Sequence, residues 1–136
     1  MSLMEERGRL MFNQKPYSLK VGIYLPKIYL YHTAEDSDQF YKDKFLYKEC
    51  CRKVVDYFTL RYGGCTRIEA IGTYKSKYET DVAYNIHEQI IYAYMADDCL
   101  NEQELYDLCS GCCKVLRQDT IAIEVNNEMY FIASKE

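Results

Sequence analysis

The alternation of two residue periodicities along this chain constrains its fold more than any other feature. Apolar side chains recur every three or four positions from Phe45 to Tyr62 and again from Leu105 to Leu116, which is typical of helices that bury one side. Strand-like alternation at every second position is found in residues 17–25, 65–76, 84–95 and 120–125. The segments therefore follow one another as strand, helix, strand, strand, helix and strand.

Local signals mark where these segments begin and end. The first helix is expected to begin within or just after the acidic segment 34–39 and to end at Gly63–Gly64, because glycine readily adopts the left-handed conformation found after helices. Asn101, with Glu104 three residues later, is typical of a capping box at the start of the second helix. Asn126–Asn127 predicts a two-residue turn before a short last strand, because asparagine tolerates positive φ.

The two middle strand segments predict an antiparallel hairpin, in which Gly72 indicates a bulge or a close approach of the backbone. The βαββαβ order predicts an α+β fold: a ferredoxin-like sandwich with an antiparallel sheet, both helices on one face and a C-terminal β-hairpin. The other face of the sheet is expected to be free for water, a second chain or a ligand. Whether residues 27–33 pair with the sheet stays open. The expected core includes Val54, Phe58, Leu105, Leu108 and Cys112.

Length and charge limit the class of protein. The 136 residues predict a single domain over residues 15–136, after a polar segment 1–14 that is disordered or added by cloning. The chain has no apolar stretch of about 20 residues and no signal peptide, so we expect a cytoplasmic protein without a membrane partner. The net charge of −4 argues against a nucleic-acid partner. The basic stretch Lys42 to Lys53 also contains acidic residues and is interpreted as a solvated helix face.

Seven cysteines are many for a cytoplasmic chain, and we expect them to be reduced thiols that pack as small apolar residues. Cys109 and Cys112 have the spacing of metal ligands, and Cys113 adds a third sulfur. A closed zinc site would need a second pair, and only the adjacent Cys50–Cys51 is present. We therefore predict no metal and no cofactor, while metal binding by this cluster stays an alternative.

A carboxylate within an apolar strand is the strongest candidate for a functional group. Glu88 interrupts a face formed by Ile86 and Ile90, and burying an ionised carboxylate is costly unless it is paired or hydrogen-bonded. Partial burial raises the pKa of a carboxyl group, as in many acid/base sites. In the predicted hairpin, Glu88 lies across from Gly72 and Tyr74, so the Tyr74 hydroxyl is expected to reach it.

Gln118, at the end of the second helix, either caps the turn or reaches the sheet edge where ligands bind in many α+β domains. The candidate ligand-binding residues are Gly72, Tyr74, Glu88 and Gln118, and Glu88 and Tyr74 are also the candidate catalytic residues. A hydrogen bond between Tyr74 and Glu88 has two interpretations, a structural lock and a functional pair. We favour the lock.

Several short motifs occur in a recognisable order: Gly63-Gly64-Cys65-Thr66, Gly72-Thr73-Tyr74, Glu88 and Gln118-Asp119-Thr120-Ile121. Together they resemble a group of small uncharacterised bacterial ferredoxin-like proteins. This chain departs from their pattern with Cys65 for Ala, Tyr74 for Trp and Asp119 for Glu. The group has no established activity, so the resemblance supports the fold and the candidate positions and implies no reaction.

The chain contains 15 tyrosines, a residue that suits protein interfaces because its large ring carries a polar tip. We interpret the protein as a non-enzymatic binding or interaction module that acts through the free sheet face. The expected partners are a second copy of the chain in a homodimer, and a small molecule or another protein. The alternative is a small enzyme that uses Glu88 as general acid/base with Tyr74 as hydrogen-bond donor in an oligomer cleft. An enzyme requires a concave pocket with converging polar groups at Glu88.

Overall fold

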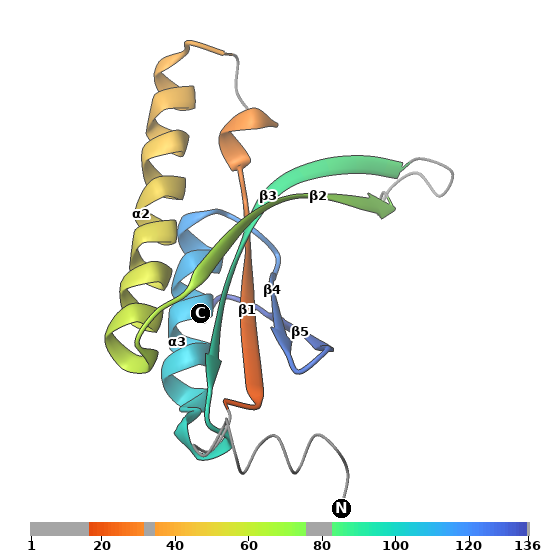
Figure 1. Cartoon of the computed structure of the whole chain (residues 1–136). Helices are drawn as coiled ribbons and strands as arrows, with labels where there is room; N and C mark the ends of the chain where they lie inside the picture. Colours follow the sequence, from red (N-terminus) through yellow and green to blue (C-terminus); the bar gives the residue numbers. More distant parts are fainter. Residues whose placement is uncertain (1–16, 32–34, 76–82, 136) are drawn as a thin grey trace, which may run out of the picture.

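The computed structural model describes residues 17–31, 35–75 and 83–135 (Figure 1). The segment predicted over residues 1–14 and the turn of the middle hairpin lie outside these residues. The elements follow in the order β1 (Leu19–Pro26), η1 (Ile28–Leu30), α2 (Asp38–Tyr62), β2 (Thr66–Lys75), β3 (Ala83–Met95), η2 (Asp97–Cys99), α3 (Glu102–Val115), β4 (Ile121–Val125) and β5 (Glu128–Ile132). The η elements are single turns of 3₁₀ helix. The sequence leaves undecided whether residues 27–33 pair with the sheet, and their described part contains η1.

The five strands form one sheet in the order β2-β3-β1-β4-β5, with every neighbouring pair antiparallel. Both α2 and α3 lie on the same side of this sheet (Figure 1). The predicted α+β class, with an antiparallel sheet and two helices, is confirmed. One face of the sheet is therefore covered by helices, and we call the opposite one the uncovered face.

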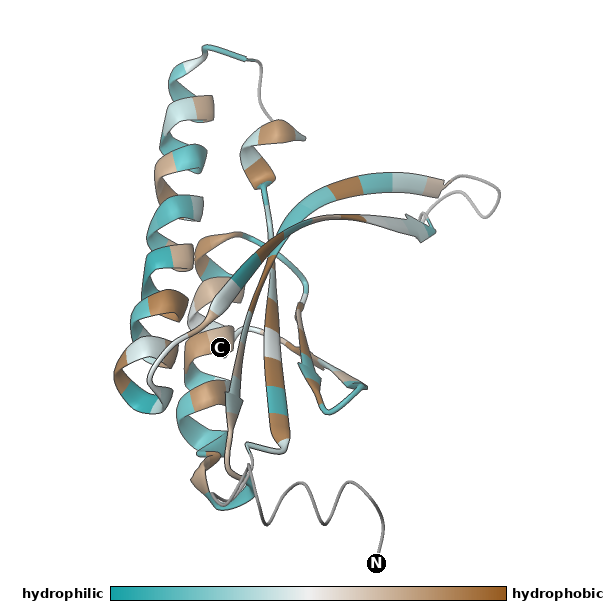
Figure 2. Cartoon of the chain, in the orientation of Figure 1, coloured by the Kyte–Doolittle hydropathy of each residue, from teal (hydrophilic) through white to brown (hydrophobic). Residues whose placement is uncertain are grey.

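The hydrophobic core lies between the helices and the covered face. Alternate residues of β1 and β3 point into it, among them Ile23 and Ile91, which are fully buried. Of the predicted core residues, Leu108 is half-buried and the other four are buried: Val54, Phe58, Leu105 and Cys112. Figure 2 shows hydrophobic positions alternating with hydrophilic ones along α3, as expected for a helix with one buried side.

The predicted helix and turn signals have the expected geometry. Ser37 caps α2, since its Oγ accepts a hydrogen bond of 3.1 Å from the Phe40 N–H, and Gly63 ends the helix with a φ of 91°. Asn101 Oδ1 accepts a 3.0 Å hydrogen bond from the Glu104 N–H at the start of α3. Asn126–Asn127 turns the chain from β4 to β5 with φ values of 47° and 70°.

The basic stretch on α2 is less solvated than the sequence predicts. Asp43 has no exposed surface. Its Oδ1 accepts hydrogen bonds from Arg117 Nη2 at 3.0 Å and from Gln39 Nε2 at 2.8 Å. Arg117 follows α3 in the chain, so this ion pair ties the first turns of α2 to the end of α3. The expectation of a fully solvated helix face is therefore wrong at Asp43.

The cysteines pack mainly in the core. Five of the seven are buried between the helices and the sheet: Cys50, Cys51, Cys109, Cys112 and Cys113. All seven thiols are free. Within residues 17–31, 35–75 and 83–135, no three Cys, His, Asp or Glu side chains come together as a metal site. No described helix has both the length and the apolar character needed to cross a membrane.

Candidate functional site

Glu88 lies on the uncovered face, near the middle of β3. Side chains alternate along a strand, and since Gln89 and Ile91 face the helices, Glu88 faces away from them. Glu88 is nevertheless only 6% exposed. Its neighbours across the sheet are Ala70 on β2 and Pro26 on β1. The far half of the β2–β3 hairpin bends away from the helices and overhangs this side of the sheet (Figure 1).

Gly72 allows the side chain of Tyr74 to reach Glu88. The Tyr74 ring folds back along the uncovered face over Gly72, where a Cβ atom would lie 2.6 Å from the Tyr74 hydroxyl oxygen. In this position the hydroxyl donates to the Glu88 carboxylate, with distances of 3.2 Å to Oε1 and 3.4 Å to Oε2. The group that approaches Gly72 closely is therefore the Tyr74 side chain. The strand pairing continues through Gly72, so no bulge is present there.

The register of the hairpin differs from the prediction. Glu88 pairs with Ala70, whereas Gly72 pairs with Ile86 and Tyr74 with Tyr84. Glu88 was expected roughly across from Gly72 to Tyr74, and its partner Ala70 lies two residues before the nearer end of that range. Tyr74 still reaches Glu88, four positions along β3 from its own partner Tyr84, because its long side chain folds back over Gly72.

Further tyrosines come close to Glu88 from other elements. Tyr24 projects from the adjacent strand β1, and its hydroxyl donates to Glu124 Oε1 at 3.2 Å. Tyr31 follows η1, and its hydroxyl accepts a hydrogen bond from the His87 N–H. Burial is the main cause that raises the pKa of both phenols. Glu124 raises the pKa of Tyr24 further, and Glu88 does so more weakly. Glu88 also raises the pKa of Tyr31. Sequence analysis missed both residues, since neither lies on the hairpin.

The electrostatic state of Glu88 follows from this environment. Burial raises the pKa of the Glu88 carboxyl group, and the hydrogen bond from Tyr74 only partly offsets that rise. Burial and the Glu88 charge raise the pKa of Tyr74 to about 12, so Tyr74 stays protonated and acts as a donor. No Lys or Arg among the described residues forms an ion pair with Glu88. Among the described residues, the site therefore holds a carboxyl group that no cation pairs with.

Gln118 lies in a neighbouring cavity and not in contact with Glu88. Its side-chain Nε2 donates to the Leu116 carbonyl at 2.9 Å, which is the turn-capping role considered for it. The cavity measures about 260 Å³ and is lined by Pro26, Ile28, Tyr31, Tyr84, Ile86 and Gln118. Since Pro26 pairs with Glu88 and Tyr31 is near it, this cavity adjoins the carboxylate site.

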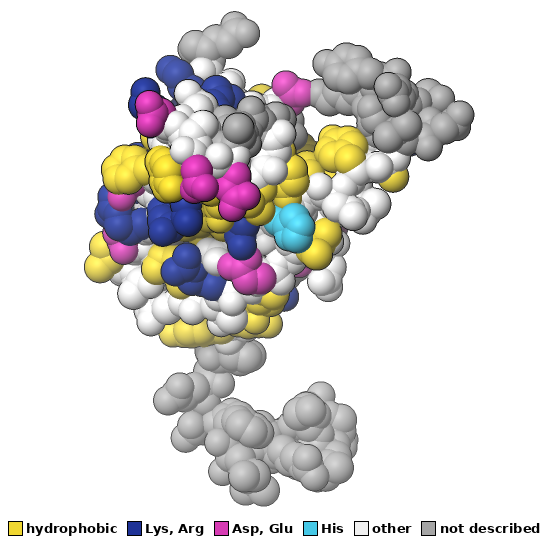
Figure 3. Space-filling view, turned by 90° about the horizontal axis from the view of Figure 1, so that it is seen from above, with side chains coloured by type: hydrophobic (Ala, Val, Ile, Leu, Met, Phe, Trp, Pro, Cys, Tyr) yellow, Lys and Arg dark blue, Asp and Glu magenta, His cyan; other side chains and the backbone are white. Residues whose placement is uncertain are grey.

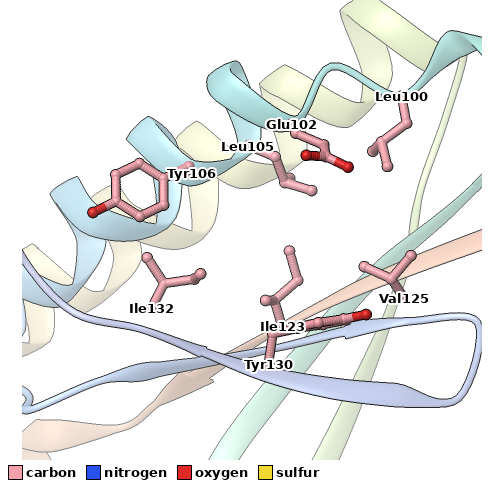
Figure 4. A pocket seen from close by; sticks show the side chains of 8 residues that line it. All are labelled: Leu100, Glu102, Leu105, Tyr106, Ile123, Val125, Tyr130 and Ile132. Carbon is pink, nitrogen blue, oxygen red and sulfur yellow. The ribbon is translucent and has the colours of Figure 1, made fainter.

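A second cavity, of about 280 Å³, lies on the covered side between α3 and the β4–β5 hairpin (Figure 4). Its walls are mainly apolar: Leu105 and Tyr106 point from the helix toward Ile123 and Ile132 of the strands. Glu102 supplies its one carboxylate. The polar groups do not converge on a point here, so Glu88 remains the better candidate site.

No protein-family model matches the sequence, and no curated protein matches it. Among solved structures, the chain is similar to a phage SAM lyase in complex with S-methyl-5′-thioadenosine, with a TM-score of 0.51 and 11% identity over 85% of this chain and 89% of that one. The phage SAM lyase in the apo state aligns with a TM-score of 0.46 and 8% identity over 87% and 90% of the two chains. At these identities the likeness concerns the fold alone.

The interpretation of the chain as a non-enzymatic binding or interaction module is wrong on this comparison, because the solved structure that shares its fold is an enzyme. Glu88 is 6% exposed and forms no ion pair with any described residue. The alternative, a small enzyme with Glu88 and Tyr74 in its site, is better supported. The roles of Gly72, Tyr74, Glu88 and Gln118 stay predictions, as does the resemblance to the bacterial group.

Proposed function

We propose that this protein is a small lyase that acts on SAM (S-adenosylmethionine) or a closely related sulfonium compound at Glu88 and Tyr74. The observation that carries the proposal is the Glu88 carboxylate, which is 6% exposed and lacks a cationic partner among the described residues. A sulfonium ion supplies the missing positive charge. The tyrosine rings around Glu88 favour the same ligand, because aromatic faces attract cations that carry no hydrogen-bond donors.

We further infer that the fold is ferredoxin-like. The strand order β2-β3-β1-β4, with a helix after β1 and another after β3, is the arrangement of a split βαββαβ sandwich. The strand β5 extends this sheet at the β4 edge. We keep the expectation of a cytoplasmic protein as a proposal.

The cavity beside Glu88 has room for the rest of the substrate. Its walls combine apolar groups, such as Ile28 and Ile86, with the rings of Tyr31 and Tyr84. Such walls suit the purine of the substrate, which is flat and largely apolar. Gln118 uses its Nε2 to cap the turn, which leaves its Oε1 as an acceptor for a polar group at the rim.

Release of S-methyl-5′-thioadenosine from SAM breaks the bond between the sulfonium sulfur and the γ carbon, and the electron pair goes to sulfur. In one route Glu88 takes a proton from the β carbon, and the C–H electrons form a carbon–carbon double bond. In the other route the substrate's own carboxylate attacks the γ carbon and closes a lactone, while Glu88 serves as the counter-charge of the cation. The second route transfers no proton, and intramolecular attack is intrinsically fast.

We also propose that the chain forms a homodimer or larger homo-oligomer through the uncovered face, so that the site lies in a cleft between copies. Large apolar side chains on this face are exposed, among them Ile68, Tyr94 and Phe131. Monomeric proteins rarely expose large contiguous apolar patches. Light scattering at micromolar concentration should give a mass above the 16.1 kDa of one chain, and a mass of 16.1 kDa would contradict the assembly.

The proposed activity is tested by incubating the full-length protein with SAM and measuring S-methyl-5′-thioadenosine by liquid chromatography. The expected result is release of this thioether at a rate proportional to protein concentration. The two co-products are isomers, so proton NMR distinguishes them: vinyl protons indicate Glu88 as the base, and their absence with a ring methylene signal indicates the lactone. A folded protein that leaves SAM unchanged would overturn the proposal.

A further inference from the structure

A second region gathers charged groups on the opposite side of the sheet from Glu88. A cavity of about 470 Å³ lies between α2 and the covered face of β2 and β3. Four cationic side chains and one carboxylate line it: Lys27, Lys48, Arg52, Arg67 and Glu69. Seen from above, Lys and Arg side chains gather on one side of the molecule, with Asp and Glu among them (Figure 3).

Two of these cations keep free hydrogen-bond donors. Arg52 is paired with Glu49 and Asp56, and Lys27 is paired with Glu69. Arg67 donates through Nε to Gln89 Oε1 at 2.8 Å, and neither of its Nη atoms has a partner in the described part of the chain. Lys48 forms no ion pair with any described residue.

Buried polar groups in the cavity wall make this more than a patch of surface charge. Gln89 is 7% exposed and is held between Arg67 and Glu69, since its Nε2 donates to Glu69 Oε1 at 2.8 Å. Tyr47 is 5% exposed, and its hydroxyl lies beside the Cys51 thiol, a weak hydrogen-bond partner. A thiol is a weak partner, so the Tyr47 hydroxyl can still donate to an oxygen of a ligand in the cavity.

We propose that this cavity binds a small phosphate-bearing molecule. The free donors come from Lys48 on α2 and Arg67 on β2, and Lys27, which follows β1, lines the cavity from a third segment. A ligand that satisfies these donors presents several anionic oxygens at once. Phosphate does so, whereas a carboxylate offers two oxygens in one plane. The volume suits a small molecule. Glu49 and Asp56 beside Arg52 repel an extended polyanion, which excludes a nucleic-acid backbone as the preferred ligand.

This inference does not rest on the proposed lyase activity. Neighbouring residues of β3 point to opposite faces, so Gln89 lines the cationic cavity while Glu88 lies in the other site. A phosphate compound in the cavity therefore does not compete with a substrate at Glu88. Binding of a phosphate compound should therefore persist in Glu88→Gln. The phosphate site and the lyase activity can thus fail independently of each other.

The test is isothermal titration of the full-length protein with pyrophosphate, and separately with inorganic phosphate, at physiological ionic strength. We expect saturable binding of one anion per chain. Arg67→Gln should weaken it at least tenfold. The matched control is Lys53→Gln, which removes the same charge from an exposed position of α2 that does not line the cavity; it should change the Kd less than twofold.

Tyr47→Phe provides a second readout that a surface effect does not produce. It removes a hydrogen-bond donor from the cavity wall and leaves the charge unchanged, so it should weaken pyrophosphate binding severalfold. Absence of saturable binding by wild type would overturn the proposal. Equal weakening in Arg67→Gln and Lys53→Gln would also overturn it, because diffuse charge alone would then explain the binding.

Discussion

Asp43 and Glu88 are both nearly inaccessible carboxylates, and they lie on opposite sides of the sheet. On the helix side, Asp43 is neutralised by Arg117 and accepts a further hydrogen bond from Gln39. On the uncovered face, Glu88 receives hydrogen bonds from Tyr74 and has no cation beside it among the described residues. The buried charge on the helix side is therefore paired within the fold, whereas on the uncovered face no described cation pairs with Glu88.

The aromatic residues of the two faces differ in the same way. Phe58 on the covered side is fully buried in the core, whereas Phe131 on the uncovered face is 63% exposed. The side chains whose burial stabilises the single chain are therefore concentrated on the covered side of the sheet. On our proposal, the tyrosines and the carboxyl group of the other side contact the substrate.

The largest expected effect is on catalysis at the uncovered face. Glu88→Gln keeps the shape of the side chain and removes its charge, so SAM cleavage should fall by about 10²–10⁴-fold, the range typical of a lost acid/base or counter-charge group. Chromatographic measurement of S-methyl-5′-thioadenosine gives the rate. Glu128→Gln is the control, because Glu128 is an exposed carboxylate of β5 that accepts from Tyr130 on the covered side; its rate should stay within about twofold of wild type. Equal losses in both variants would contradict the assignment of Glu88.

A second prediction compares the same residue type on the two faces. Phe58→Ala should lower the free energy of unfolding by about 3–5 kcal/mol, because it leaves a cavity in the core. Phe131→Ala removes an exposed ring and should cost less than about 1 kcal/mol in the monomer. Urea denaturation at low protein concentration measures both. Similar losses for the two variants would show that the faces do not differ as described.

A third prediction concerns the backbone beneath Tyr74. Gly72→Ala places a methyl group against the Tyr74 ring and should displace its hydroxyl from Glu88, so the rate should fall by about tenfold, as in Tyr74→Phe. Gly22→Ala is the matched control, since Gly22 is also within a strand on the uncovered face and its Cβ would lie 3.5 Å from Tyr92 Cβ, an ordinary contact. If Gly72→Ala is fully active, the Tyr74 hydrogen bond is dispensable.

Much of the fold was predictable because its signals are local. The cap at Asn101, the turn at Asn126–Asn127 and the helix end at Gly63 each depend on a few adjacent residues. The burial of Asp43 was not predictable, because its partner Arg117 is 74 residues away in the sequence. A charged residue within a basic stretch gives no local sign of a distant counter-charge.

The candidate site was predictable in part for the same reason. Glu88 and Tyr74 belong to one hairpin, so alternation and an approximate register placed them together, although the exact pairing of Glu88 with Ala70 depends on a turn whose length the sequence does not specify. Tyr24 joins the site because β1 inserts between β3 and β4. The cationic cavity likewise combines Lys48 of α2 with Arg67 of β2, and only the tertiary fold brings them together.

The central claim is that Glu88 is kept on the uncovered face for function and at a cost to folding. Burial raises its pKa in the folded protein, so ionised Glu88 destabilises the fold at a pH above that raised pKa, and the effect disappears as the pH falls below the ordinary glutamate value. The direct measurement is the free energy of unfolding of wild type and Glu88→Gln at pH 8 and at pH 4. We predict that Glu88→Gln is at least as stable as wild type at pH 8 and that any difference shrinks at pH 4. A loss of about 1–3 kcal/mol in Glu88→Gln at pH 8 would instead identify the Tyr74–Glu88 pair as a structural lock and contradict the claim.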